Sequence, residues 1–207
     1  VHAAPGLGPL MDNGGPTLTH ALLPGSPAIN AGDPSFTAMT EFDQRGPGFP
    51  RLVGGRIDIG AFEFVQPMDI LKQQLKLRFA KSNADSFGLT ASLDPGASFS
   101  PAGLMLHVDM GGAVINLALD AKGRGKTAQG SVKLALNKKT GEWTLKAKFK
   151  KGSWGGSWAD EGLVNDTVAK PGILVTMGTT ITIGSMTFEG QRSLVYTAKA
   201  GKSGAAK

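Results

Sequence analysis

The sequence contains no cysteine among its 207 residues, which excludes disulfide bonds, cysteine-ligated zinc sites and thiol chemistry. It also has no apolar run close to the ~18 residues that a membrane-spanning helix needs. A basic leader followed by an apolar stretch, the pattern of a signal peptide, is absent as well. Because the chain begins with Val1 instead of Met, we expect it to be a processed or truncated piece of a longer protein.

Positive charge is scarce in the first third of the chain and abundant afterwards. In residues 1–66 the positively charged side chains are all arginines and the net charge is −3, whereas residues 67–207 have a net charge of +9. Such a break predicts two domains of different character. We expect a first domain over 1–66, a linker over 67–74 and a second domain over 75–200. The lysine-rich tail over 201–207 has the composition of a disordered segment unless an edge strand or a neighbouring subunit holds it.

Glycine is frequent, at 30 residues, about twice the usual share of ~7%. Together with many threonines and valines, it predicts an all-β chain of short strands and tight turns. In the first segment, turn signals such as Asn13-Gly14 and Pro24-Gly25 recur every eight to twelve residues. Ile57, Ile59 and Ala61 alternate as a short strand would. The segment has too few apolar residues for a core of its own, so we expect it to pack against something else.

Four blocks of this segment carry a resemblance to a known family. "LGPLMDNGGPTLTHALLPGSPAINAGDP", "FDQRG" and "VGGRIDIGAFEF" supply the motifs DNGGPT-x-THAL, GSPAI-x-AG, DQRG and DIGAFE over about residues 6–64. They resemble the C-terminal end of secreted bacterial right-handed parallel β-helix proteins of the choice-of-anchor Q and polymorphic-outer-membrane-protein type. The family often has Asp where this chain has Asn30. The resemblance implies a last solenoid coil and cap in an extracellular or cell-surface protein, without established catalysis.

The polar residues of the first segment fit structural roles better than a catalytic or metal site, because their spacing is irregular. Asp43 and Arg45 could form an ion pair beside a turn, and Asp12 and Asp33 could cap turns through Asx hydrogen bonds. His20 precedes an apolar run and fits a packing role better than metal ligation. We expect no cofactor and no metal.

The second segment predicts an antiparallel β-sandwich or a squat barrel. Alternating apolar residues indicate strands over 75–79 and 87–93, a hairpin around Gly111-Gly112 and another around residues 138–141. In the stretch 143–150, Trp143, Leu145, Ala147 and Phe149 should face inward. "LDAKGRGK", "TGEWTLKAKFKKG", "WADEGLVNDTV" and "YTAKAGKSGAAK" give this half a weaker resemblance to a C-terminal domain of large extracellular proteins of planctomycete-type bacteria.

Two kinds of ligand-binding residue can be named in this half. A sugar-stacking platform could include Trp154, in the Gly-rich "GSWGGSW", and the nearby Trp158, although an inward orientation of Trp158 is the alternative. Lys146, Lys148 and Lys150 should point outward, as an ordinary solvated sheet face or as a surface for polyanions.

We therefore expect a non-enzymatic structural protein of the extracellular space or cell surface. It would associate with itself, into filaments or arrays, or with upstream β-helix coils through strand edges. The alternative is a module that binds polysaccharide or another polyanion. An enzyme ranks last, because no acid–base pair or nucleophile–base spacing is visible. Specific nucleic-acid binding and a membrane span are not expected.

Overall fold

The computed structural model describes residues 4–36, 41–53, 56–96 and 98–207. The chain divides into two compact units. The N-terminal unit comprises Val1–Gln66 with Gly184–Thr187, and the C-terminal unit comprises Pro67–Ile183 with Phe188–Lys207. Each unit is described by itself.

The N-terminal unit consists mostly of turns around one small sheet. Strands β1 (Leu7–Met11) and β2 (Thr19–Leu22) pair antiparallel, and a single antiparallel bridge joins Phe42 to Pro50. Both of these pairings are antiparallel, whereas the strands of a β-helix coil pair in parallel. The coil therefore remains a prediction from the resemblance.

The predicted strand at residues 57–61 is wrong, because the structure has no strand there. Asp58 is buried, whereas Ile59 is 56% exposed. The Asp58 carboxylate faces inward because it accepts a hydrogen bond from the Asn30 amide.

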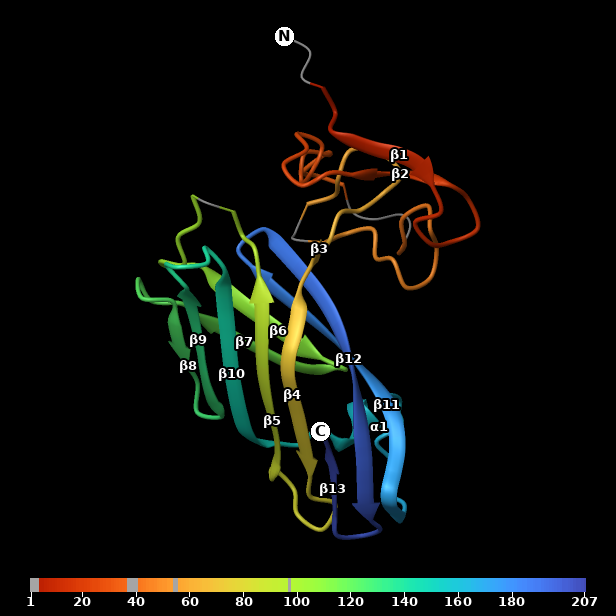
Figure 1. Ribbon diagram of the computed structural model, residues 1–207, viewed down its shortest axis with the longest axis vertical. Helices are drawn as coiled ribbons and strands as arrows, with labels where there is room; N and C mark the ends of the chain where they lie inside the picture. The colour runs from red at the N-terminus through yellow and green to blue at the C-terminus, as the bar shows by residue number, and fades with distance from the viewer. Residues whose placement is uncertain (1–3, 37–40, 54–55, 97) are drawn as a thin grey trace. The chain divides into compact units, whose positions relative to one another are not determined.

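The C-terminal unit is an antiparallel β-sandwich-like fold, which confirms the predicted all-β class; the sheet does not close into a barrel. The strands follow β3 (Gln66–Pro67) in the order β4 (Asp69–Leu77), β5 (Asp85–Leu93), β6 (Met105–Met110), β7 (Ala113–Ala118), β8 (Arg124–Lys126), β9 (Gly130–Leu136), β10 (Trp143–Gly152), β11 (Val168–Ile183), β12 (Met186–Lys199) and β13 (Ser203–Ala206). They are hydrogen-bonded in the order β7-β6-β11-β12-β13-β4-β5-β10-β9-β8. Figure 1 shows β4, β5 and β10 side by side, with β6 and β7 behind them.

Strict alternation of buried and exposed residues fixes the register of this sheet. In β10, Leu145, Ala147 and Phe149 are buried, whereas the lysines between them are exposed, as predicted. Phe87 of β5 lies directly opposite Phe149 and faces the same core. A slip by one residue would place every lysine of β10 in the core, so burial of the apolar face holds the register.

Two segments that we expected to be irregular are strands. Residues 69–74, assigned to the linker, belong to β4, which pairs with β5 and β13. A bulge between Ile70 and Lys72 interrupts the alternation there, which hides the strand in the sequence. The tail is also ordered over Ser203–Ala206, because β13 lies between β12 and β4 and satisfies the backbone groups of both.

A short helix, α1 (Gly155–Ala159), closes one end of the core. Its Trp158 donates an indole hydrogen bond to the carbonyl of Met110 over 2.8 Å. The buried Asp85 carboxylate accepts hydrogen bonds from the amides of Trp154 and Gly155, at 2.8 and 3.0 Å. These bonds tie the Gly-rich segment to β5 and β6.

Candidate ligand-binding face

The outer surface of strands β4, β5, β10, β9 and β8 is strongly basic. We call it the lysine face; its cationic members are Lys72, Lys76, Arg124, Lys126, Lys133, Lys146, Lys148 and Lys150, all exposed. The register aligns them in rows across the strands. Lys146 lies opposite Lys133 on β9, and Lys133 lies opposite Arg124 on β8. Neighbouring strands are only ~4.8 Å apart, so like charges are held close together.

A trough runs along β5 in the middle of this face. Its floor has small residues, Ser86, Gly88 and Thr90, which alternate with the buried Phe87 and Leu89. Lysines of β4 stand on one side and lysines of β10 on the other, because β5 pairs with both strands. The hollow over these strands measures about 570 Å³.

No acidic side chain balances the charge of the trough, since none of the residues that line it is Asp or Glu. Within the described part of the chain, no ion pair involves a lysine of this face. Repulsion between uncompensated like charges is a cost to the folded sheet. An anionic ligand would remove that cost, and the field of the face would attract such a ligand from solution.

Of the residues predicted to bind a ligand, only the lysines lie on this surface. Lys146, Lys148 and Lys150 point outward as expected. Trp154 and Trp158 do not form a stacking platform, because their exposed fractions are 8% and 0%. Both indoles pack against Phe87, with ring centroids 5.0 and 6.2 Å away, and they complete the aromatic core. The Gly-rich sequence around them suggested an exposed loop. The hydrogen bonds that the amides of Trp154 and Gly155 donate to Asp85 hold this segment against the core instead.

Sequence reasoning missed the lysines of β4, β9 and β8 as parts of the same surface. Lys133 alternates with Val132 and Leu134, which was a readable signal of an outward position. Lys72 was hidden by the bulge of β4, whereas Lys76 alternates with Leu75 and Leu77 in the predicted strand 75–79. β4 and β10 both pair with β5. Such pairing between distant segments cannot be read from the sequence.

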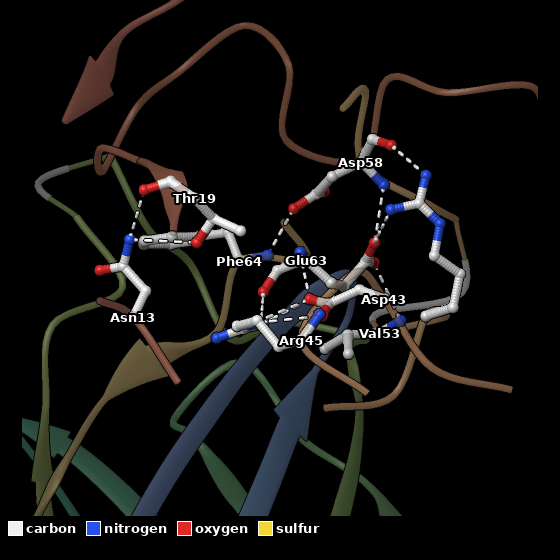
Figure 2. A network of polar contacts seen from close by, with 9 residues as sticks. Asn13, Thr19, Asp43, Arg45, Val53, Asp58, Glu63 and Phe64 are labelled. Atoms are coloured by element: carbon white, nitrogen blue, oxygen red, sulfur yellow. Dashed lines mark hydrogen bonds and ion pairs between the residues drawn. The ribbon is translucent and has the colours of Figure 1, made fainter. Parts of the chain in front are cut away.

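The N-terminal unit holds a buried network of charged side chains (Figure 2). Arg45 donates two hydrogen bonds to Asp43 Oδ2, from Nε at 3.0 Å and from a terminal nitrogen at 2.6 Å. This confirms the predicted ion pair. The guanidinium carbon of Arg45 also lies 4.1 and 3.8 Å from the ring centroids of Phe49 and Phe62. Such a paired and stacked arginine is a structural anchor.

Two further carboxylates of this network serve backbone amides. Glu63 accepts hydrogen bonds from the amides of Val53 and Asp58, at 3.1 and 3.0 Å. Burial raises the pKa of Glu63 to about 7, opposed by those two amides and by Arg51, while the nearby Asp58 raises it further. Burial also raises the pKa of Asp58. Because both carboxylates have the backbone as partners, we assign them to the structure of the unit.

The remaining polar residues singled out in the sequence also have local roles. Asp12 and Asp33 accept hydrogen bonds from the amides two residues ahead, at 2.9 and 2.8 Å, which confirms the two Asx turns. His20 is exposed, and its Nδ1 lies 2.8 Å from the Gly8 carbonyl across the small sheet. Over residues 4–36, 41–53, 56–96 and 98–207, no three His, Cys, Asp or Glu side chains form a group suited to a metal ion.

The second surface feature is apolar and belongs to the N-terminal unit. A hollow of about 420 Å³ is lined by residues of β1, β2 and the segment around Ile59. Leu10, Leu18 and Ile59, among its lining residues, are 55%, 55% and 56% exposed. Exposed apolar patches of this kind are typical of interaction surfaces.

Comparisons with known proteins give no relative for this chain: no family model, no curated protein and no solved structure matches it. Among the described residues, no helix has the length and apolar character needed to cross a membrane.

Proposed function

We propose that this protein is a non-enzymatic module of the extracellular space or cell surface that binds anionic polymers through its lysine face. The observation that carries the proposal is the concentration of exposed cations on one side of a single sheet, with no acid lining the trough between them. Binding would be mainly electrostatic. Each lysine that neutralises a charge of the polyanion releases counterions condensed on the polymer, so the affinity should fall steeply with salt.

The test compares two variants with the same loss of charge. The first neutralises members of the lysine face and consists of Lys72→Gln, Lys76→Gln, Lys146→Gln and Lys148→Gln. The control neutralises exposed lysines in turns and consists of Lys122→Gln, Lys138→Gln, Lys139→Gln and Lys202→Gln. Because all these side chains are exposed, we expect both variants to fold.

Binding of heparin and of polygalacturonate is measured by calorimetry or by retention on an immobilised polymer. We expect the wild type and the turn control to bind similarly. The lysine-face variant should bind about fourfold to several hundredfold more weakly, from about 0.2–1 kcal/mol for each of its four exposed contacts. Equal weakening of both variants would mean that only net charge matters. Failure of the wild type to bind either polymer would overturn the proposal.

A second candidate function, self-association, is supported by the apolar hollow of the N-terminal unit. Each strand of its small sheet pairs with only one neighbour among the described residues, so β1 and β2 each keep a free edge beside exposed leucines. A second copy of the chain could add its own β1 to that edge and bury both apolar surfaces.

Light scattering over a range of concentrations tests this second candidate. We expect a mass that rises with concentration in the wild type and a constant monomer mass in Leu10→Lys, which places a charge on the apolar surface. A wild type that stays monomeric at high concentration would overturn self-association and would leave the polymer-binding proposal untouched.

A further inference from the structure

We infer that the anionic polymer is a linear acidic polysaccharide and that a single chain of it lies extended in the trough along β5. This inference rests on the proposed function and adds the class of polymer and its path over the surface.

The path follows from the side chains of β5, which is the one strand of the lysine face that carries no cation there. Its outward residues Ser86, Gly88 and Thr90 are short and leave a lane between two rows of lysines. The rows on β4 and β10 are two strand spacings apart, about 9.6 Å, and successive lysines along β10 are about 6.7 Å apart. One extended chain fits such a lane, with anionic groups toward both rows.

Gly88 lies at the centre of the floor of the trough, and its backbone has no positive φ that would require glycine. A Cβ built on it would meet only the carbonyl of Ala147, at 3.9 Å. Glycine weakens a strand interior, and it often marks a place where a ligand approaches the backbone closely. On this inference, the missing side chain at position 88 lets the polymer lie close to β5.

The chemistry of the lane suits sugars carrying carboxylate or sulfate groups. The hydroxyls of Ser86 and Thr90 can donate and accept hydrogen bonds with sugar hydroxyls. The cations along the walls are lysines, which act as point charges without the planar fork of arginine. Sulfated and carboxylated glycans share the same regular negative charge, so the ligand class includes both.

Other polyanions fit the lane poorly. Single-stranded nucleic acids bind through aromatic side chains on which bases stack, and none of the exposed large apolar residues of the described chain is aromatic. Duplex DNA is read by an element that enters its major groove, which a broad sheet face cannot do. A membrane surface would need exposed apolar side chains on the same face, but the apolar residues that line the trough, such as Phe87 and Leu89, are buried.

The test is to fill the lane without changing its charge. Gly88→Ile places a branched side chain on the floor, and β-branched residues favour strands, so we expect the variant to fold with an unchanged or higher Tm. Its matched control is Ala135→Ile, on β9, which lies opposite Thr144 on the same side of the sheet but does not line the trough. Both variants keep every lysine.

Binding of size-defined oligosaccharides of heparin and of polygalacturonate is measured together with that of single-stranded DNA, polyphosphate and phosphatidylserine vesicles. We expect Gly88→Ile to bind at least one of the two glycans at least tenfold more weakly, Ala135→Ile to bind like the wild type, and the wild type to prefer a glycan to the other polyanions at equal charge. If the wild type binds glycans and Gly88→Ile binds them equally well, the lane is wrong although the lysine face stands. If DNA, polyphosphate or vesicles bind more tightly than both glycans, the ligand class is wrong; if nothing binds, the proposed function itself fails.

Discussion

Removing the guanidinium of Arg45 should destabilise the N-terminal unit severely and leave the C-terminal unit intact. The change is Arg45→Met, which keeps much of the apolar volume between the rings of Phe49 and Phe62. It leaves the Asp43 carboxylate, whose side chain is 0% exposed, without its counter-charge. It also removes the hydrogen bond that Arg45 donates to the Glu63 carbonyl, at 2.9 Å.

The size of the effect follows from these contacts. Removing one partner of a buried ion pair costs about 3–5 kcal/mol, because the other charge is left buried and uncompensated. The two ring contacts would add about 0.5–2 kcal/mol each if they were fully lost, but the methionine side chain retains part of that packing. We therefore expect a loss of about 3–5 kcal/mol, which is about two to three and a half orders of magnitude in the opening equilibrium of the unit.

The chain offers separate probes for its two units. All three tryptophans, at positions 143, 154 and 158, belong to the C-terminal unit, so their fluorescence does not report on the N-terminal unit. Hydrogen exchange at the Glu63 amide, which donates to Asp43 at 2.8 Å, reports on the network directly. We expect this exchange to accelerate a hundredfold or more while the tryptophan unfolding midpoint stays unchanged.

The control for this prediction is the double variant Asp43→Asn with Arg45→Met. It removes the stranded charge together with the arginine, so it should recover a large part of the lost protection. Exchange that is as slow in Arg45→Met as in the wild type would refute the reasoning, as would a shift confined to the tryptophan signal.

Three further predictions concern single residues. Because the folded pKa of Glu63 is raised to about 7 from 4.5, its contribution to stability, about 3 kcal/mol, is present below pH 4.5 and lost as the pH rises through about 7. Glu63→Gln should flatten this part of a pH series of hydrogen exchange, and an unchanged pH dependence would count against the shift. Asp85→Ala should lower the free energy of unfolding of the C-terminal unit by about 2–3 kcal/mol, seen in tryptophan fluorescence during urea unfolding. The buried amide of Trp154 and the half-buried amide of Gly155 lose their acceptor in this variant. Gly204→Val should lower Tm by several degrees, whereas Ser203→Val should not, because a Cβ at position 204 would lie 2.5 Å from the Tyr196 hydroxyl; equal Tm values for the two variants would contradict this packing.

The sequence predicts the parts of this fold that depend on neighbours along the chain. The alternation in β10, the Asp43–Arg45 pair two residues apart and the Asx turns at Asp12 and Asp33 all follow from local spacing. The first part of β4, residues 69–74, escapes prediction because the bulge after Ile70 breaks the alternation.

Other features depend on partners far away in sequence. The burial of Trp154 is set by Asp85 and Phe87, about seventy residues earlier. The order of the tail depends on the pairing of β13 with β12 and β4, in which Gly204 leaves room for the Tyr196 hydroxyl. The lysine face arises in the same way, because its rows come from strands paired across the sheet. Spacing along the chain can place single lysines outward, but it does not show that those of different strands share one surface.

The measurement that tests the lysine face most directly is a footprint of lysine reactivity. The protein is acetylated briefly with and without a saturating acidic polysaccharide, and the modification of each lysine is measured by mass spectrometry. We predict strong protection of Lys72, Lys76, Lys146 and Lys148 and little change at the turn lysines Lys122, Lys138, Lys139 and Lys202. Uniform protection of all lysines, or protection confined to the turns, would contradict the account.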